Sequence, residues 1–322
     1  DAEEIANALV ARGIRSGAVS LLHSYAEPQN ELVGGAALER AGLLVSRSSD
    51  VLPVFREYER TSTVAIDAYV APVARGYIER LGRAIGARLR ILQSSGGALS
   101  ASEAARTPVR MVLSGPAGGV AGARAVARAA GVERCITLDM GGTSTDVSVL
   151  DGEPHVTTEG SVAGFPVAIP MLEIHTIGAG GGSIARIDEG GALCVGPHSA
   201  GADPGPACYG TGDHATVTDA NLAAGRLPPR LLDGAMTLND ERARRALATL
   251  GLDDPAAGIV RLVNAHMAAA VRLLTVERGV DARPFTLLAF GGAGPLHACE
   301  VADELGIERA LIPAAPGLLC AW

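Results

Sequence analysis

The sequence predicts an α/β fold, in which short apolar strands alternate with amphipathic helices. Residues 136–150 alternate apolar and polar side chains on both sides of a Gly-Gly turn, which is typical of two half-buried strands. Residues 60–86 instead repeat their apolar side chains at the helical spacing of about 3.6. A chain of 322 residues, 48% of them hydrophobic, can bury a large core, which we expect to be divided between two lobes.

The expected elements follow from hydrophobic spacing and from Gly and Pro. Strands are expected at 19–23, 90–93, 136–150 (a hairpin), 285–290 and 310–312, and helices at 30–42, 60–86, 116–130, 240–250, 256–279 and 295–305. Pro72 is expected to bend or break its helix. Residues 153–232 are rich in Gly, Pro and Ala, and so long a loop-rich stretch is unusual in a compact domain unless it is functional.

Charge and composition exclude several classes of protein. The 27 basic and 35 acidic residues leave a net charge of −8, and no basic cluster indicates nucleic-acid binding. No apolar stretch reaches the roughly 20 residues that span a membrane. The five cysteines are scattered, without zinc-type CxxC pairs, as in proteins with reduced thiols. We therefore expect a cytoplasmic protein without nucleic-acid or membrane partners.

Every basic residue is arginine, because the sequence contains no lysine. A Walker-type GxxxxGK loop, a Schiff-base enzyme and a biotin-carrying lysine are thereby excluded. Any bound phosphate must be neutralised by backbone N–H groups, hydroxyls, a metal ion or arginine.

The hairpin at residues 136–150 is the first candidate site. Asp139 stands at the end of its first strand, and Gly141 and Gly142 allow the backbone N–H groups to approach a phosphate. Thr143, Ser144 and Thr145 add hydroxyl donors, and the carboxylate of Asp139 is suited to hold Mg²⁺ through water. The alternative is an ordinary hairpin with a Gly-Gly turn.

The strand at 285–290, its GGAG turn and the following helix form the second candidate site. Gly291, Gly292 and Gly294 would let the backbone approach a ligand at an open helix end, and Gly292 is expected to require a positive φ. The alternative is tight packing between strand and helix. His297 stands near the start of this helix, close to the turn, and could as easily be a packing residue as a residue of the site.

Residues 174–210 form a third candidate site. His175, His198 and Asp203 could bind a metal, and the glycines at 178–182 could let the backbone approach a ligand. The alternative is histidines that satisfy local hydrogen bonds and Gly-Pro runs that turn the chain. At the start of the helix at 60–86, we expect Arg56, Glu57 and Arg60 to be solvated.

Eight ordered blocks resemble the hydantoinase A/oxoprolinase family. They are LLHSYAEP (21–28), FREYERTST (55–63), QSSGGALS (93–100), LSGPAGGV (113–120), LDMGGTSTDVS (138–148), IHTIGAGGGSIA (174–185), AGADPGPACYG (200–210) and FGGAGPLHA (290–298). The resemblance implies the actin-like ATPase (ribonuclease H-like) fold, with two lobes around ATP and Mg²⁺ or Mn²⁺. Asp139 and Thr143 would be catalytic, the glycines and Ser144 of the hairpin turn would hold phosphate, and residues 291–294 would face adenosine.

The chain departs from the family pattern at both ends. At the C-terminus it stops at PGLLCAW, where members of the family continue into a long C-terminal region. Members usually begin with another DxGGT-type loop, so the fold is expected to be incomplete at the N-terminus, with residues 1–115 completing the first lobe and 116–322 forming the ATPase lobe, which includes an insertion at 153–232. Actin-like sites clamp the nucleotide between two phosphate loops, so we expect a fragment that does not turn over substrate alone. An open sheet edge would favour self-association into a homo-oligomer.

The resemblance implies ATP-dependent hydrolysis of a cyclic amide, of the hydantoin or 5-oxoproline type, by phosphorylation of its carbonyl oxygen. Two alternatives remain: the ATP-using subunit of an acetone- or acetophenone-type carboxylase, acting on a ketone, and a nucleotide-binding or assembly module without catalysis. Members commonly work with a hydantoinase B-type partner subunit.

Overall fold

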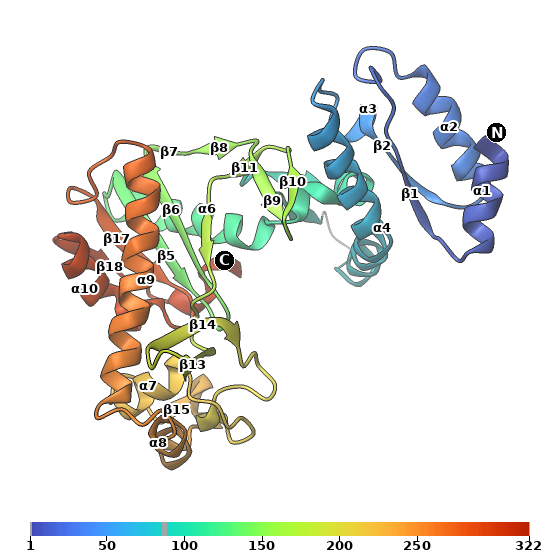
Figure 1. Cartoon of the computed structure of the whole chain (residues 1–322). Coiled ribbons are helices and arrows are strands. Elements are labelled where there is room, and N and C mark those ends of the chain that lie inside the picture. The colour runs from blue at the N-terminus through green and yellow to red at the C-terminus, as the bar shows by residue number, and fades with distance from the viewer. Residues whose placement is uncertain (1, 86–88, 322) are drawn as a thin grey trace. The chain divides into compact units, whose positions relative to one another are not determined.

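The computed structural model describes residues 2–85 and 89–321, which divide into two compact units (Figure 1). Unit 1 comprises the chain up to Ala117 together with Val156–Glu173, and unit 2 comprises Gly118–His155 and Ile174 onward. The first division lies two residues from the predicted one at 115/116. The prediction that residues 156–173 belong to the ATPase lobe is wrong, because this segment packs in unit 1: Val167, Ile169 and Met171 share one apolar cluster with Val64 of α4.

Unit 1 is mixed α/β and built around one long helix. Its elements are α1 (Ala2–Ala11), β1 (Ser16–Val19), α2 (Gln29–Arg40), β2 (Leu44–Arg47), α3 (Ser48–Val51), α4 (Glu57–Ile85), β3 (Arg90–Leu92), β4 (Ala98–Ser100), α5 (Ala101–Arg106), β8 (Val156–Thr157), β9 (Gly160–Val162), β10 (Phe165–Val167) and β11 (Met171–Leu172), with a 3₁₀ turn at Pro108–Met111. β1 and β2 pair in parallel, whereas β3–β4, β9–β10 and β8–β11 pair antiparallel.

One local prediction for unit 1 is wrong, and one of the two outcomes expected at Pro72, the break, does not occur. The strand expected at 19–23 ends at Val19, and His23 has a φ of 60°, which a continuing strand does not permit. α4 continues through Pro72 without a break. The last residue of the predicted helix, Gly86, lies outside the described residues.

The prediction of a solvated helix start at Arg60 is also wrong. Arg60 is completely buried, and its guanidinium donates to the carbonyl oxygens of Leu21 and Val54 at 2.7 Å each. Glu31 is buried too, and its carboxylate accepts a hydrogen bond from the N–H of Leu21 at 2.8 Å. The N–H and the C=O of Leu21 are therefore both fixed by buried charged side chains.

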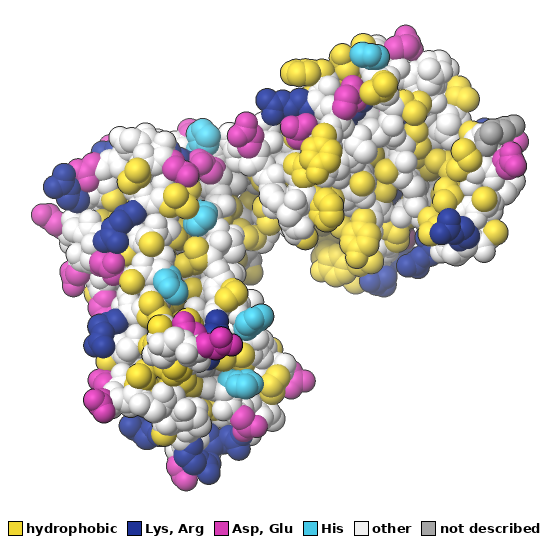
Figure 2. Space-filling view, in the orientation of Figure 1, with side chains coloured by type: hydrophobic (Ala, Val, Ile, Leu, Met, Phe, Trp, Pro, Cys, Tyr) yellow, Lys and Arg dark blue, Asp and Glu magenta, His cyan; other side chains and the backbone are white. Residues whose placement is uncertain are grey.

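α4 also presents an apolar surface. Tyr58 and Tyr69 are 70% and 84% exposed, and with Phe165 of β10 they line an open hollow of about 630 Å³. Figure 2 shows hydrophobic side chains gathered over this helix. Such patches are typical of contact surfaces.

Unit 2 is a mixed sheet with helices packed against it. Its elements are α6 (Ser114–Ala129), which begins in unit 1, β5 (Arg134–Met140), β6 (Thr145–Asp151), β7 (Glu153–Pro154), β12 (His175–Ile177), β13 (Ser183–Ile187), β14 (Leu193–Ser199), α7 (Val217–Ala223), β15 (Arg230–Leu231), β16 (Met236–Thr237), α8 (Asp240–Ala248), α9 (Pro255–Glu277), β17 (Thr286–Phe290), α10 (Gly294–Leu305) and β18 (Arg309–Leu311), with 3₁₀ turns at Ala207–Tyr209, Leu232–Gly234 and Pro316–Ala321. The sheet order is β12-β6-β5-β17-β18.

The core of unit 2 lies between this sheet and its helices. Ile136 and Leu138 of β5 pack with Met267 of α9 and Val301 of α10 in one buried cluster. α9 is long and apolar enough to cross a membrane by length and composition. Its apolar side is buried in this cluster, however, so its apolar composition is explained by its place in the core.

The loop-rich region contains one helix that was not predicted, α7. Thr216 caps it: the Thr216 hydroxyl accepts from the N–H of Asp219, and the Asp219 carboxylate accepts from the N–H of Thr216. The spacing of a threonine three residues before an acidic residue is a helix-start signal that could have revealed it.

Candidate functional site

Two predicted sites meet at one edge of the sheet in unit 2. β5 and β17 are parallel neighbours, and Phe290 stands opposite Asp139. Because both strands run in the same direction, the hairpin turn (residues 141–144) and the β17 turn (residues 291–294) leave the sheet at the same edge. They also touch, since the N–H of Ala293 donates to the carbonyl oxygen of Met140 at 2.9 Å. Carboxyl ends of neighbouring parallel strands are a common position for ligand sites.

The hairpin turn is held by backbone contacts. The N–H of Gly141 donates to the carbonyl of Ser144 at 3.0 Å, and the N–H groups of Gly181 and Gly182 donate to the carbonyls of Gly141 and Gly142 at 2.9 and 2.6 Å. A Cβ on Gly180 would lie 2.6 Å from backbone atoms of Thr143 and Ser144. The close approach predicted for the glycines at 178–182 is therefore to the hairpin turn itself.

The β17 turn differs from the prediction in one respect. Gly292 needs no positive φ and has open space where a Cβ would stand, whereas Gly291 has a φ of +80°. A Cβ on Gly291 would lie 2.4 Å from the carbonyl oxygen of Met140, and one on Gly294 would lie 3.0 Å from that of Leu138. Gly291 and Gly294 thus permit tight packing against β5, and Gly292 faces open space.

Asp146 is a candidate site residue that was not predicted from the sequence. In the β5–β6 register it stands directly opposite Asp139. Partial burial raises the pKa of both carboxyl groups, and for Asp146 the negative charge of Asp139 raises it further. The hydroxyl of Thr176 on β12 donates to Asp146 Oδ1 at 2.5 Å and opposes this rise.

Two further residues surround Asp139. Burial and the Asp139 carboxylate raise the pKa of the Cys320 thiol to about 12, so the thiol stays protonated and donates to Asp139 Oδ2 at 3.0 Å. A Cβ on Gly119 of α6 would lie 3.2 Å from the same oxygen. Asp139 is therefore held between α6 and the C-terminal 3₁₀ turn.

The pair of carboxylates suits a divalent cation. Mg²⁺ prefers carboxylate oxygens together with water, and its charge would relieve the repulsion that raises the pKa of Asp146. Asp139 and Asp146 would hold the ion, and the hydroxyls of Thr143 and Ser144 lie in the adjoining turn.

The third predicted site gains no support as a metal centre. His175 is on β12, His198 is exposed near the end of β14, and Asp203 is exposed in the following turn. Among the residues that the structure describes, no three His, Cys, Asp or Glu side chains lie close enough together to hold a metal ion.

His297 is a packing residue. It is completely buried, and its Nδ1 and Nε2 lie 2.7 Å from Asn264 Oδ1 and 3.2 Å from Asn221 Nδ2. This assigns the Nδ1–H tautomer, because Nδ1 must donate to the Asn264 oxygen and Nε2 must accept from the Asn221 amide. Burial, with a smaller contribution from Arg226, lowers the pKa of His297 to about 4.

We expect the stability of unit 2 to fall as the pH falls from about 6.5 to 4. The folded state keeps His297 neutral while the unfolded chain takes up a proton. The contribution of neutral His297 to stability is therefore fully present above the pKa of the unfolded chain, about 6.5. It is lost as the pH falls towards the folded pKa of about 4, by up to about 3 kcal/mol. Urea unfolding at pH 7 and pH 4.5 should show a smaller acid loss for His297→Gln than for the unmodified chain. The exposed His198→Gln is the control, and an equal acid loss in all three proteins would contradict the assignment.

The chain is similar to known proteins over most of its length. The sequence model of the hydantoinase/oxoprolinase family matches residues 60–322. The chain is 38% identical over 327 residues to the caprolactamase subunit alpha of Pseudomonas jessenii, covering 96% of this chain and 47% of that protein. It is 36% identical over 343 residues to the 5-oxoprolinase of Saccharomyces cerevisiae, covering 99% of this chain and 26% of that protein.

Two solved structures share the fold. The nucleotide-free structure of an acetone carboxylase matches with a TM-score of 0.85 at 30% identity, covering 99% of this chain and 48% of that chain. The ATP-dependent caprolactamase of Pseudomonas jessenii matches with a TM-score of 0.83 at 37% identity, covering 99% and 49%. The chain thus spans about half the length of the caprolactamase subunit and about a quarter of the 5-oxoprolinase. With the family match extending over most of its length, the chain belongs to the hydantoinase/oxoprolinase family.

Proposed function

We propose that this chain is the ATP-binding part of an enzyme that opens a cyclic amide at the expense of ATP. The observation that carries the proposal is the convergence of two carboxylates and two glycine turns at one sheet edge of unit 2. The similarity to ATP-dependent caprolactamase and to 5-oxoprolinases supports it. We further propose that the whole protein has the actin-like two-lobed fold and works with a hydantoinase B-type subunit; the caprolactamase relative is itself named as a subunit.

Each part of the site has a role in this proposal. Asp139 and Asp146 would hold Mg²⁺, which when bound would neutralise phosphate charge. The N–H group of Gly142 and the hydroxyl of Thr143 would hold phosphate oxygens, while the N–H of Gly141, bonded to the carbonyl of Ser144, would keep the turn in shape. The β17 turn would lie against adenosine, where the open space at Gly292 permits approach.

The chemistry follows from the weakness of an amide as an electrophile. The amide carbonyl oxygen attacks the γ-phosphorus and ADP departs, which leaves an O-phosphorylated carbon with a good leaving group. Water would attack that carbon, and the C–N bond of the resulting tetrahedral adduct would break as the departing amine takes up a proton, which opens the ring. A second water would then hydrolyse the acyl phosphate that remains, giving the carboxylate and free phosphate. Transfer of this kind requires mainly positioning and charge neutralisation, which the fixed N–H and hydroxyl donors and a Mg²⁺ held by the two carboxylates would supply.

A second candidate is the ATP-using part of a ketone carboxylase, because the acetone carboxylase structure matches with a TM-score of 0.85. Here the oxygen that is phosphorylated would belong to a ketone or to bicarbonate. A nucleotide-binding assembly module without turnover is the third, and for it we expect nucleotide binding but no substrate-stimulated phosphate release.

The test measures nucleotide binding and phosphate release separately. Calorimetry of the purified chain should detect Mg·ATP binding. Phosphate release should then be followed with 5-oxoproline, hydantoin, caprolactam, and acetone plus bicarbonate, for the chain alone and after addition of the remaining segments found in its longer relatives and a hydantoinase B-type subunit. We expect stimulation by a cyclic amide only in the completed assembly; stimulation by acetone plus bicarbonate alone would select the carboxylase, and no Mg·ATP binding in either form would refute the proposal.

A further inference from the structure

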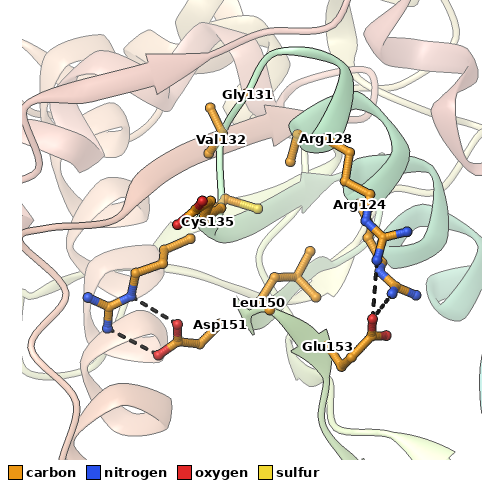
Figure 3. A pocket seen from close by; sticks show the side chains of 12 residues that line it. Arg124, Arg128, Gly131, Val132, Cys135, Leu150, Asp151 and Glu153 are labelled. Carbon is orange, nitrogen blue, oxygen red and sulfur yellow. Dashed lines mark hydrogen bonds and ion pairs between the residues drawn. The ribbon is translucent and has the colours of Figure 1, made fainter.

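A second site lies at the other end of the β5–β6 hairpin. It is an open pocket of about 620 Å³ in unit 2, formed by the C-terminal half of α6, the start of β5 and the end of β6 (Figure 3). β5 and β6 have seven residues each, so about 20 Å separates this pocket from the hairpin turn. The pocket is therefore distinct from the candidate nucleotide site.

On one wall of the pocket, the charged side chains already have partners. Arg134 makes a two-pronged pair with Asp151, at 3.0 Å from Nε to Oδ1 and 3.1 Å from Nη2 to Oδ2. Its guanidinium also lies over the ring of Phe285, 4.2 Å from the ring centroid. A bidentate, stacked arginine has little freedom to bind anything else.

On the opposite wall, two arginines still have N–H groups that could bind a ligand. Arg124 and Arg128, one helical turn apart on α6, both donate to the single oxygen Oε1 of Glu153 (Figure 3). The Nε of Arg124 is buried without a hydrogen-bond partner, and the side chain of Glu153 is 71% exposed. Two guanidinium groups thus share one solvent-exposed carboxylate, which a better-placed carboxylate could displace.

We propose that Arg124 and Arg128 bind the carboxylate of a small amino acid, and that Glu153 occupies their site in the empty protein. Leu150 and Ala127 provide apolar lining for a short aliphatic chain, and the open side of the pocket leaves the amine end in water. Opening a lactam yields a molecule with a carboxylate at one end and an amine at the other. The choice of ligand therefore rests on the proposed function, whereas the two-arginine carboxylate site does not.

Calorimetry without nucleotide tests this site, with 6-aminohexanoate and glutamate as probes and 6-aminohexanamide as the matched compound without a carboxylate. Glu153→Gln removes the internal competitor and should bind the acids at least tenfold more tightly than the unmodified chain, a change of about 1.4 kcal/mol. The double variant Arg124→Gln, Arg128→Gln should lose binding. Arg244→Gln, which removes an arginine paired with Asp240 outside the pocket, should bind as the unmodified chain does.

Melting curves establish that each variant is folded. If the double variant does not fold, Arg128→Gln alone replaces it, because the side chain of Arg128 is 65% exposed. The proposal is overturned if Glu153→Gln binds neither acid at millimolar concentration, if it binds no more tightly than the unmodified chain, if the arginine variants bind unchanged, or if the amide binds as well as the acids. Because the assay contains no ATP, a failure here leaves the nucleotide proposal standing, and a failure to bind Mg·ATP leaves this site standing.

Discussion

Replacing Asp139 with Asn should lower the affinity for Mg·ATP by about 10- to 100-fold, because interactions with a charged group contribute roughly 1.5–3 kcal/mol each. The isosteric amide can still accept the hydrogen bond from Cys320. It lacks the negative charge that a divalent cation requires. Calorimetry with ATP, with and without Mg²⁺, measures the change, and the loss should appear only when Mg²⁺ is present.

The same substitution should raise the melting temperature of the nucleotide-free protein. Asp139 and Asp146 stand opposite each other, and their raised pKa values mean that folding disfavours their ionised forms at neutral pH. The substitution removes the cost of burying one charge and also its repulsion of Asp146, and each 1 kcal/mol gained corresponds to roughly 2–4 °C in a domain of this size. Scanning calorimetry at pH 7 gives the value.

Opposite effects on affinity and stability distinguish a functional carboxylate from a structural one. Asp240→Asn is the matched control, since it removes an exposed carboxylate paired with Arg244 and should change neither quantity much. If Asp139→Asn instead lowers the melting temperature and leaves Mg·ATP affinity unchanged, Asp139 is a structural residue and does not belong to the site.

Asp146 shows what the sequence could have revealed about the site. Asp139 and the glycines are recognisable because the strand end, the turn and the hydroxyls are adjacent in the chain. Asp146 lies seven residues beyond Asp139, and only the strand register makes them partners: Met140 pairs with Thr145, so Asp139 pairs with Asp146. Extending the predicted hairpin by that one step would have identified it.

Contacts between distant segments could not be predicted in this way. Residues 156–173 follow the hairpin directly in the chain, yet Thr63 of α4 accepts a hydrogen bond from the N–H of Ala168, 105 residues away. Arg60 sits in a charged helix start that is usually solvated, and it is buried because the carbonyls of Leu21 and Val54 provide its partners. Such pairings depend on tertiary packing, which overrides local propensity.

Gly291→Ala should destabilise unit 2 by about 4 kcal/mol, the combined effect of a side chain in the left-handed region and of overpacking. The φ of Gly291 is +80°, and its added Cβ would lie 2.4 Å from the carbonyl oxygen of Met140 and 2.5 Å from Asp139 Oδ1. The Met140 carbonyl cannot move freely, because Met140 is buried in β5 and this carbonyl accepts a hydrogen bond from the N–H of Ala293. Urea unfolding measures the loss.

Gly292 provides a control one residue away. Its Cβ would meet nothing within 4 Å and its φ is not positive, so Gly292→Ala should change the free energy of unfolding little. The larger Gly292→Val would project a branched side chain into the space proposed for adenosine, and should weaken ATP binding while the protein remains folded. If Gly292→Val binds Mg·ATP as the unmodified chain does, the β17 turn only packs against β5. If Gly291→Ala is as stable as Gly292→Ala, the tight contact between the β17 turn and the end of β5, on which the arrangement of the site depends, is wrong.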